Sequence, residues 1–394
     1  MTLIKVPKFD DETKNNPTLK DHKLVILTPW APPPNYIASL QQKFPDLVVE
    51  YHAPPQSEWT QPGSESSSPF PIEQWKHVTI LLTFTYLPQP KDAPKLQYVQ
   101  LISAGANHIL DHPLFREREE VEFCTANGVH GPQISEWVLL TYLSFNHRLP
   151  HYLNLQKQAH WSRGHFDSIE DATAKTVGIL GYGAIGRQTA RLAVAMGMRV
   201  HAYTLHARPT PESRKDGGWA PVGMGDPEGV FPSRWFSGRS KEDLHRFLGS
   251  GLDLLVVSTP LTPGTKHLLG KEEFEVLYNS SPPVTFVDET TGHGEPRGRT
   301  FVSNIARGPV IHTDDLIDAL EGGLIRGAAL DVTDPEPLPD GHRLWSTRNV
   351  ILTPHVSGAS TRYNERVLAI LEENLGRLGR GEGLVNEVSK KEGY

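Results

Sequence analysis

Short apolar runs and amphipathic stretches alternate along the first half of the chain. Five apolar runs have the length of buried strands: 24–29, 47–52, 78–88, 96–105 and 121–128. Residues 35–44 instead have the pattern of a short helix. Repeated units of strand, crossover and strand predict a parallel sheet with helices on its faces.

The apolar spacing becomes helical at 135–149, so we expect a long helix there with Ser135 as its N-cap. Residues 176–204 follow the order strand, glycine turn, helix and strand. Further strands are predicted at 252–260, 300–308, 325–332 and 349–358, and an amphipathic closing helix at 361–381. Two irregular stretches, 206–240 and 279–299, are predicted to be insertions in surface loops.

The composition is that of an ordinary folded protein. The chain has 394 residues, of which 38% are hydrophobic and 22% charged, enough for two or three domains. No apolar run reaches the roughly 18 residues of a transmembrane helix, and the polar first residues lack the apolar core of a signal peptide. We therefore expect a cytoplasmic protein that does not bind membranes.

Charge and cysteine content exclude further classes of function. The net charge is −7 and no dense Lys/Arg cluster stands out, so nucleic-acid binding is not expected. Cys124 is the only cysteine, which excludes an intrachain disulfide and fits a reducing compartment. Its thiol could be a nucleophile, but the surrounding run VEFCTA favours a buried strand position.

Residues 181–186, GYGAIG, fit the pattern G-x-G-x-x-G in its expected context. An apolar strand precedes them, and a helix and a second strand follow, as in a dinucleotide-binding βαβ unit. In that unit Gly181 makes the tight turn, Gly183 lets the backbone approach a pyrophosphate, and Gly186 lets helix and strand pack closely. The phosphates would lie at the helix N-terminus, where the helix dipole favours negative charge. A glycine turn without a ligand is the alternative.

The end of the second strand indicates which dinucleotide is bound. NAD enzymes carry Asp or Glu there for the ribose 2′-hydroxyl, whereas this chain has Thr204 and no carboxylate before Glu212. His206 and Arg208 follow closely and suit a 2′-phosphate. We therefore favour NADP(H) over NAD(H). In the alternative, Arg208 faces solvent and the Thr204 hydroxyl holds a plain ribose.

Three later strands are each followed by one chemically useful side chain. Arg307 follows FVSNIA, Glu336 comes after ALDV, and His355 follows VILTP. Ligands of parallel α/β sheets bind outside the carboxyl ends of the strands. If these strands share one sheet, all three side chains are expected to point toward the cofactor.

Four segments in this order resemble the D-isomer-specific 2-hydroxyacid dehydrogenase family. They are the glycine turn, NIARGPVIHTDDLIDAL (304–320), ALDVTDPEPLP (329–339) and TPHVSGAS (353–360); the resemblance extends from SAGANHI (103–109) to the closing helix. It implies an oxidoreductase that transfers a hydride between NAD(P)H and a small 2-oxoacid or D-2-hydroxyacid, as glyoxylate/hydroxypyruvate reductases do. A dinucleotide-sensing corepressor-like protein on the same fold is the alternative.

The resemblance also implies the roles of individual residues. Arg307 would bind the substrate carboxylate and polarise the keto oxygen. His355 would be the acid/base, and Glu336 would hydrogen-bond the other imidazole nitrogen and fix its tautomer. The backbone of Ser103, Ala104 and Gly105 would hold the substrate carboxylate.

Further residues are expected beside the dinucleotide by the same resemblance. Those not yet named are Tyr182, Ala184, Ile185, Thr259, Pro260, Thr265, Ile305, Ala306, Asp331 and Gly358, with His355 also in contact. Trp161 lies where related enzymes carry an aromatic residue near the cleft, and a packing role is equally compatible. His293 and Glu295 in GHGEPRGR have no third ligand nearby, so no metal site is predicted.

The resemblance implies an α/β fold class with two Rossmann- and flavodoxin-like domains, each a parallel sheet with helices on both faces. Residues 1–129 with 359–394 would form the flavodoxin-like substrate domain. Residues 130–358 would form the NAD(P)-binding Rossmann domain with the two insertions. The active site would lie in the interdomain cleft, and the helix at 135–149 would help to form a homodimer.

Overall fold

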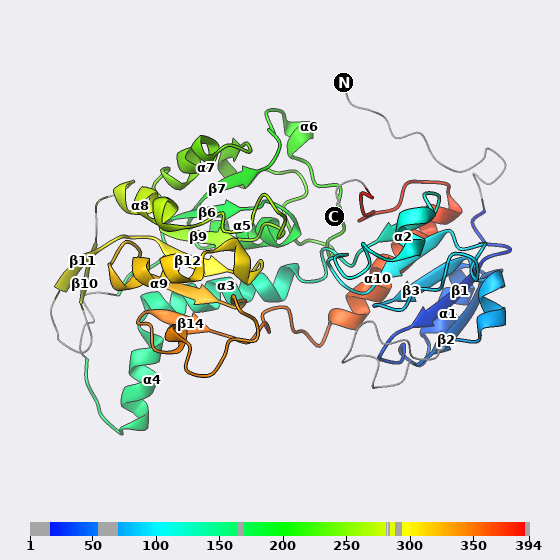
Figure 1. Cartoon of the computed structure of the whole chain (residues 1–394), viewed down its shortest axis with the longest axis horizontal. Coiled ribbons are helices and arrows are strands. Elements are labelled where there is room, and N and C mark those ends of the chain that lie inside the picture. Colours follow the sequence, from blue (N-terminus) through cyan, green and yellow to red (C-terminus); the bar gives the residue numbers. More distant parts are fainter. Residues whose placement is uncertain are drawn as a thin grey trace. The chain divides into compact units, whose positions relative to one another are not determined.

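The computed structural model describes residues 16–53, 70–163, 169–280, 282, 284–287 and 294–390. The chain divides into two α/β units (Figure 1). Unit 1 comprises Met1–Val129, Gly217–Pro221 and Thr361–Tyr394, and unit 2 comprises His130–Asp216 and Val222–Ser360. Each unit is built on a parallel sheet, so the predicted fold class is confirmed.

Unit 1 contains five parallel strands in the order β2-β1-β3-β4-β5, which is the order of flavodoxin-like folds. The strands are β1 (Lys23–Leu27), β2 (Val48–His52), β3 (Ile80–Thr83), β4 (Tyr98–Leu101) and β5 (Glu122–Cys124). The helices are α1 (Tyr36–Lys43), the 3₁₀ helix η3 (Ile72–His77), α2 (Pro113–Glu117) and α10 (Tyr363–Gly379).

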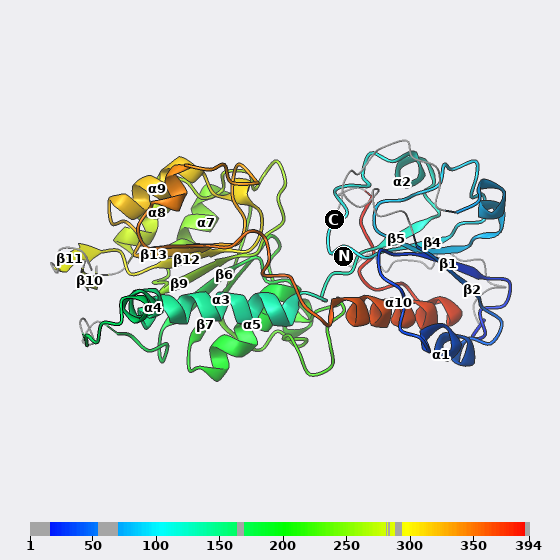
Figure 2. The same ribbon diagram turned by 90° about the horizontal axis from the view of Figure 1, so that it is seen from below.

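The sheet of unit 1 is covered on both faces. Leu24 and Ile26 of β1 pack in the apolar cluster that includes α10, whereas Val25 and Leu27 pack in the cluster that includes Leu114 of α2. Figure 2 shows α1 and α10 on one side of this sheet and α2 on the other. Burial on both faces explains why these strands are continuous apolar runs in the sequence. The thiol of Cys124 is buried in β5, as predicted.

Unit 2 contains seven parallel strands in the order β14-β13-β12-β9-β6-β7-β8. This is the doubly wound dinucleotide-binding order extended by one strand, and it reverses between β6 and β9. The strands are β6 (Thr176–Leu180), β7 (Arg199–Thr204), β8 (Pro232–Ser237), β9 (Leu254–Val257), β12 (Phe301–Asn304), β13 (Gly327–Leu330) and β14 (Val350–Leu352). Ligands of such sheets bind at the reversal point, beside the carboxyl ends of the strands.

Helices cover both faces of this second sheet, with α3 and α5 on one side and α7, α8 and α9 on the other (Figure 2). They are α3 (Gly131–Asn146), α4 (Leu149–Lys157), α5 (Ala184–Ala195), α6 (Pro211–Arg214), α7 (Lys241–Leu248), α8 (Lys271–Asn279) and α9 (Thr313–Glu321), with the 3₁₀ helices η5 (Gly308–Val310) and η6 (Arg343–Trp345). The strands β10 (Val284–Val287) and β11 (Gly294–Arg297) pair antiparallel within the predicted insertion 279–299. His293 lies outside the described residues.

The start of the long helix differs from the prediction. Helix α3 begins at Gly131 with His130 as N-cap, so the assignment of Ser135 as N-cap was wrong. Pro132 lies in the first turn, where its missing N–H costs no hydrogen bond. The Ser135 hydroxyl is buried and donates to the Ile185 carbonyl at 3.3 Å. The serine therefore fastens α3 to α5.

The stretch 206–240 is less irregular than predicted. It contains α6 and the edge strand β8, which pairs parallel with β7. Because β8 is an edge strand with exposed side chains, its sequence PSRWFS lacks the apolar run of a central strand. Gly217–Pro221, in the same stretch, belong to unit 1 rather than to unit 2.

Candidate active site

The glycine turn lies at the carboxyl end of β6, beside the reversal point of the sheet. Gly181 has φ of +104°, and a Cβ there would lie 2.8 Å from the Ser258 and Thr259 backbone after β9. Gly186 lies in α5, and its Cβ would lie 2.6 Å from the Gly181 carbonyl oxygen. At Gly183, by contrast, an added Cβ would have nothing within 4 Å. The turn is therefore closed on the protein side and open on the other.

This geometry fits a dinucleotide pyrophosphate. Gly183 is the N-cap of α5, and no side chain caps that helix. The backbone N–H groups of the first turn, at Ala184, Ile185 and Gly186, belong to a helix end whose dipole attracts phosphate. The open space at Gly183 is the close backbone approach that a pyrophosphate needs.

The side chain of Tyr182, between the first two glycines, is buried in an apolar cluster of unit 2. Its hydroxyl donates to the buried Asp226 Oδ2 at 2.7 Å. Burial and this neighbouring carboxylate raise the pKa of the Tyr182 phenol well above its usual range. Tyr182 is therefore a permanent donor that ties the turn to the loop before β8, a role that its position in the motif did not reveal.

The residues expected at the 2′ position follow β7. The Thr204 hydroxyl donates to the His206 carbonyl at 2.8 Å, and the His206 side chain is exposed. The half-buried Arg208 uses Nη1 to donate to the Ser213 carbonyl at 2.5 Å. A guanidinium has five N–H donors, so this bond leaves others for a phosphate.

A second loop faces the reversal point from β9. Thr259 is half-buried and Pro260 is exposed directly after the strand. The Thr265 hydroxyl donates to the Pro260 carbonyl at 2.7 Å and accepts from the Thr262 N–H at 2.7 Å. Thr265 therefore closes this loop on itself.

Arg307, Glu336 and His355 follow β12, β13 and β14, which are neighbours in the sheet. The exposed Arg307 donates from Nη1 to the Ala306 carbonyl at 2.7 Å. The next residue, Gly308, has no room for a Cβ because the Thr333 carbonyl group lies against it. The arginine loop is therefore packed on the loop that carries Glu336. Ile305 and Ala306 are buried just before it.

Glu336 and His355 are in direct contact. The distance from His355 Nδ1 to Glu336 Oε1 is 2.7 Å. Nδ1 is thus the nitrogen that donates to the carboxylate, and Nε2 is left for another partner. The imidazole is 47% exposed, so Nε2 is accessible to a small molecule.

Asp331, at the end of β13, organises the loop that carries His355. Its buried carboxylate accepts hydrogen bonds from the Thr353 and Ser357 hydroxyls, both at 2.5 Å, and from the N–H groups of Val356 and Ser357 at 2.9 and 3.0 Å. His355 itself has φ of +55°, and its N–H donates to the Asp331 carbonyl at 2.8 Å. The sequence suggested a cofactor contact for Asp331 but not this set of donors.

The remaining predicted residues lie on either unit. Gly358 follows the His355 loop, and its carbonyl accepts from Gln133 Nε2 at 3.0 Å. Ser103, Ala104 and Gly105 follow β4 in unit 1, where the Ser103 hydroxyl donates to the Gly105 carbonyl at 2.8 Å. That bond holds the three residues in a tight loop. The side chain of Trp161 is 91% exposed, so it does not pack in the core formed by the described residues.

Two features are absent from the part of the chain that the structure describes. No set of three or more His, Cys, Asp or Glu side chains is arranged to hold a metal ion there. Within the same residues, no helix combines the length and the hydropathy needed to cross a bilayer.

The sequence matches one family model over more than half of its length. Residues 139–223 and 236–357 match the model for the D-isomer specific 2-hydroxyacid dehydrogenase, NAD binding domain. The interruption between the two matched ranges falls in the loop before β8 and at the start of that strand.

Individual proteins are similar over most of the chain. A glyoxylate reductase of Thermofilum pendens is 28% identical over 301 residues, which cover 75% of this chain and 76% of that protein. A hydroxypyruvate reductase of Blautia hydrogenotrophica is 24% identical over 313 residues, covering 77% and 83%. A D-isomer specific 2-hydroxyacid dehydrogenase of Xanthobacter autotrophicus Py2, crystallised with NADPH and MES, superposes with a TM-score of 0.65 at 25% identity, covering 95% of this chain and 99% of that one.

Proposed function

Because the chain belongs to the D-isomer-specific 2-hydroxyacid dehydrogenase family, we propose that it uses NADPH to reduce a small 2-oxoacid to the D-2-hydroxyacid. The observation that carries this proposal is the 2.7 Å contact between Glu336 and His355, on loops that follow neighbouring strands. Arg307 follows the next strand of the same sheet. The three side chains supply anion binding, a proton donor and a carboxylate that orients it.

Arg307 would bind the 2-oxoacid. A guanidinium matches a carboxylate with two parallel N–H···O bonds and can also reach a neighbouring keto oxygen. Its side chain is exposed, and its one described bond is to the Ala306 carbonyl. The positive charge would draw electron density toward the keto oxygen and make the keto carbon more electrophilic.

His355 would supply the proton. With Nδ1 held by Glu336, the protonated imidazole donates from Nε2 to the keto oxygen, which becomes the hydroxyl of the product. The imidazole then regains a proton from solvent, to which it is exposed. The Glu336 carboxylate keeps the ring oriented and balances the charge of the imidazolium. A bound nicotinamide supplies the hydride.

We infer NADPH rather than NADH as the preferred dinucleotide. The end of β7 carries no carboxylate, the Thr204 hydroxyl is occupied by the His206 carbonyl, and Arg208 lies in the loop that follows. A 2′-phosphate would meet the guanidinium of Arg208 there. The similar Xanthobacter autotrophicus protein was crystallised with NADPH.

Glyoxylate and hydroxypyruvate are the substrates to test first. The two relatives named above are a glyoxylate reductase and a hydroxypyruvate reductase. The tight loop Ser103–Gly105 would hold the oxoacid carboxylate through its backbone N–H groups. We propose the cytoplasm as the location, since the single buried Cys124 suits a reducing compartment. We also propose a homodimer.

The test is a steady-state assay of the purified full chain. NADPH or NADH is supplied with glyoxylate, hydroxypyruvate and a panel of larger 2-oxoacids, and oxidation is followed at the nicotinamide absorbance. We expect turnover with a lower KM for NADPH than for NADH. In His355→Gln, kcat should fall about 10²–10⁴-fold because no side chain delivers the proton. His77→Gln, at an exposed position of η3, is the control and should behave like the wild type.

Three results would each overturn a part of the proposal. Absence of turnover across the panel, in a protein that still binds NADPH, would favour the corepressor-like alternative. A kcat for His355→Gln equal to that of the control would remove His355 from the chemistry. A lower KM for NADH than for NADPH would overturn the 2′-phosphate assignment alone.

A further inference from the structure

The loop between β7 and β8 belongs to both units. The chain leaves unit 2 after Asp216, contributes Gly217–Pro221 to unit 1 and returns at Val222. The units are already joined covalently at 129–130 and at 360–361. The loop begins beside Arg208, where we placed the 2′-phosphate. One end therefore lies at the proposed cofactor site, while its middle belongs to the unit that carries the proposed oxoacid loop.

Trp219 holds the middle of this loop in unit 1. Its half-buried indole packs against the apolar cluster that contains Ala126 and Val129. The backbone N–H of Trp219 donates to Asn386 Oδ1 at 3.2 Å. Gly128 has φ of +97°, and a Cβ at that position would overlap the Trp219 carbonyl oxygen. Glycine at 128 is thus what allows the loop to approach this segment.

Residues 125–127, which are bonded to Asn386 below Trp219, are also hydrogen-bonded to the proposed oxoacid loop 103–105. Asn386 Nδ2 donates to the Asn127 carbonyl at 2.8 Å, and the Thr125 N–H donates to the Asn386 carbonyl at 3.0 Å. The residue between them, Ala126, donates its N–H to the Ser103 carbonyl at 2.8 Å. A shift of Trp219 would therefore reach Ser103 through the side-chain amide of Asn386 and the backbone hydrogen bonds of residues 125–127.

The flanks of the loop are fixed to the helix that follows the glycine turn. The buried Arg187 of α5 donates from Nη2 to the Arg214 carbonyl at 2.7 Å and from Nη1 to the Asp226 carbonyl at 2.5 Å. Arg214 Nε donates in turn to the carbonyl of Arg208 at 3.0 Å. Gln188 Oε1 accepts from the Gly225 N–H at 2.7 Å. Arg208 therefore belongs to the network that fixes the two ends of the loop that carries Trp219.

We propose that Trp219 is a positioning residue that links the two ligand sites. Through it, the affinity for the 2-oxoacid depends on whether the bound dinucleotide carries a 2′-phosphate. The inference rests on the proposed function. A 2′-phosphate bound by Arg208 stabilises one arrangement of the loop, and Trp219 imposes that arrangement on the backbone that ends at Ser103. NADH has no 2′-phosphate and gives no such effect. Because coupling between two ligands is reciprocal, the oxoacid also tightens the binding of NADPH.

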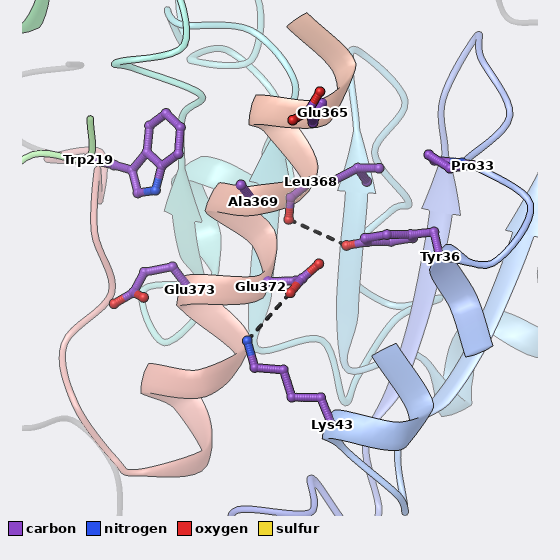
Figure 3. A pocket seen from close by; sticks show the side chains of 9 residues that line it. All are labelled: Pro33, Tyr36, Lys43, Trp219, Glu365, Leu368, Ala369, Glu372 and Glu373. Atoms are coloured by element: carbon purple, nitrogen blue, oxygen red, sulfur yellow. Dashed lines mark hydrogen bonds and ion pairs between the residues drawn. The ribbon is translucent and has the colours of Figure 1, made fainter. Parts of the chain in front are cut away.

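Trp219 has room to move and can be replaced. It lines a pocket of about 330 Å³ with residues of α1 and α10, and Figure 3 shows its indole directed toward α10 near Ala369. None of the residues assigned to the dinucleotide or the oxoacid lines this pocket. Since the ring is open on one side, Trp219→Ala opens no closed cavity in the core, and we expect the variant to fold.

The kinetic test compares the glyoxylate KM with saturating NADPH and with saturating NADH. In the wild type we expect the KM to be at least about fivefold lower with NADPH, the lower end of measured coupling between sites. Trp219→Ala should raise the glyoxylate KM measured with NADPH to the KM measured with NADH and leave kcat within about twofold. Trp219→Phe should restore most of the difference between the two KM values. Val222→Ala changes a fully exposed side chain of the same loop and should match the wild type. Equal losses with both dinucleotides in Trp219→Ala would show a structural role only and overturn the proposal.

Hydrogen–deuterium exchange gives a second readout that needs no turnover. Adding NADPH alone should slow exchange at 181–186 and also at 101–106 and 123–129 in the wild type. In Trp219→Ala, the protection at 181–186 should remain and the protection in the other two segments should be lost. Protection confined to 181–186 in the wild type would overturn the coupling and leave the proposed function intact. No protection at 181–186 would contradict the proposed function itself.

Discussion

Single residues show which parts of the site the sequence could reveal. Arg307, Glu336 and His355 could be proposed from the sequence because each follows an apolar strand and belongs to a motif of the family. The role of Asp331 was not found, because its donors Thr353, Val356 and Ser357 come from the next strand's loop. A carboxylate that accepts four hydrogen bonds looks in sequence like any other aspartate. Only the pairing of β13 with β14 brings these groups together.

We predict that Asp331→Asn impairs both stability and turnover. An amide offers one acceptor oxygen and two donors, so N–H and O–H groups of the 353–357 loop lose their acceptor, at a cost of about 1–3 kcal/mol. The loop should then hold His355 less accurately, and kcat should fall about 10–100-fold with little change in the KM for NADPH. Thermal unfolding and steady-state assays test this. Asp340→Asn, at an exposed position, is the control. A lower melting temperature with the kcat of the control would show that Asp331 does not position His355.

The elements of the fold were predictable where burial produces a regular pattern. The order strand, turn, helix and strand at 176–204 was found because β6 and β7 are central strands and α5 packs one face against them. The edge strand β8 was missed because its exposed side chains break the pattern. Helix α7 was also missed, although Ser240 and Asp243 form a capping box that the sequence displays.

Alanine substitutions at Gly183 and Gly186, near the start of α5, should have different effects. Gly183→Ala adds a methyl group with nothing within 4 Å, so the melting temperature without ligand should stay within about 1 °C of the wild type. The same methyl group would lie where a pyrophosphate approaches, and the Kd for NADPH should rise at least about tenfold. Gly186→Ala instead places a Cβ 2.6 Å from the Gly181 carbonyl and 2.8 Å from the Ile179 side chain. It should destabilise unit 2 by about 1–3 kcal/mol.

Thermal unfolding and fluorescence titration with NADPH separate the two effects. Each variant serves as the control for the other, since both add one methyl group to the same turn. NADPH binding by Gly183→Ala at wild-type affinity would place the pyrophosphate elsewhere.

At the scale of the whole molecule, the sequence could not predict to which unit the segment Gly217–Pro221 belongs. The sequence assigns 130–358 to one domain, yet Gly217–Pro221 belong to unit 1. Their place depends on the absence of a side chain at Gly128 and on the amide of Asn386, both remote in sequence. Such a short excursion has no periodicity of its own. It is fixed by contacts that exist only once unit 1 has folded.

We predict that the protein is a homodimer and that the outer face of α3 and α4 forms the interface. Leu140 of α3 is 60% exposed, and Leu149 and Leu153 of α4 are 43% and 47% exposed. Exposed apolar side chains that gather in a patch usually mark an interface, and these three come from two consecutive helices. Light scattering should give twice the chain mass of 43.8 kDa. Leu140→Glu should shift it toward one chain mass, because a buried carboxylate without a partner is costly. Ile72→Glu, on unit 1, should stay dimeric. A monomeric wild type, or a dimeric Leu140→Glu protein, would contradict the assigned interface.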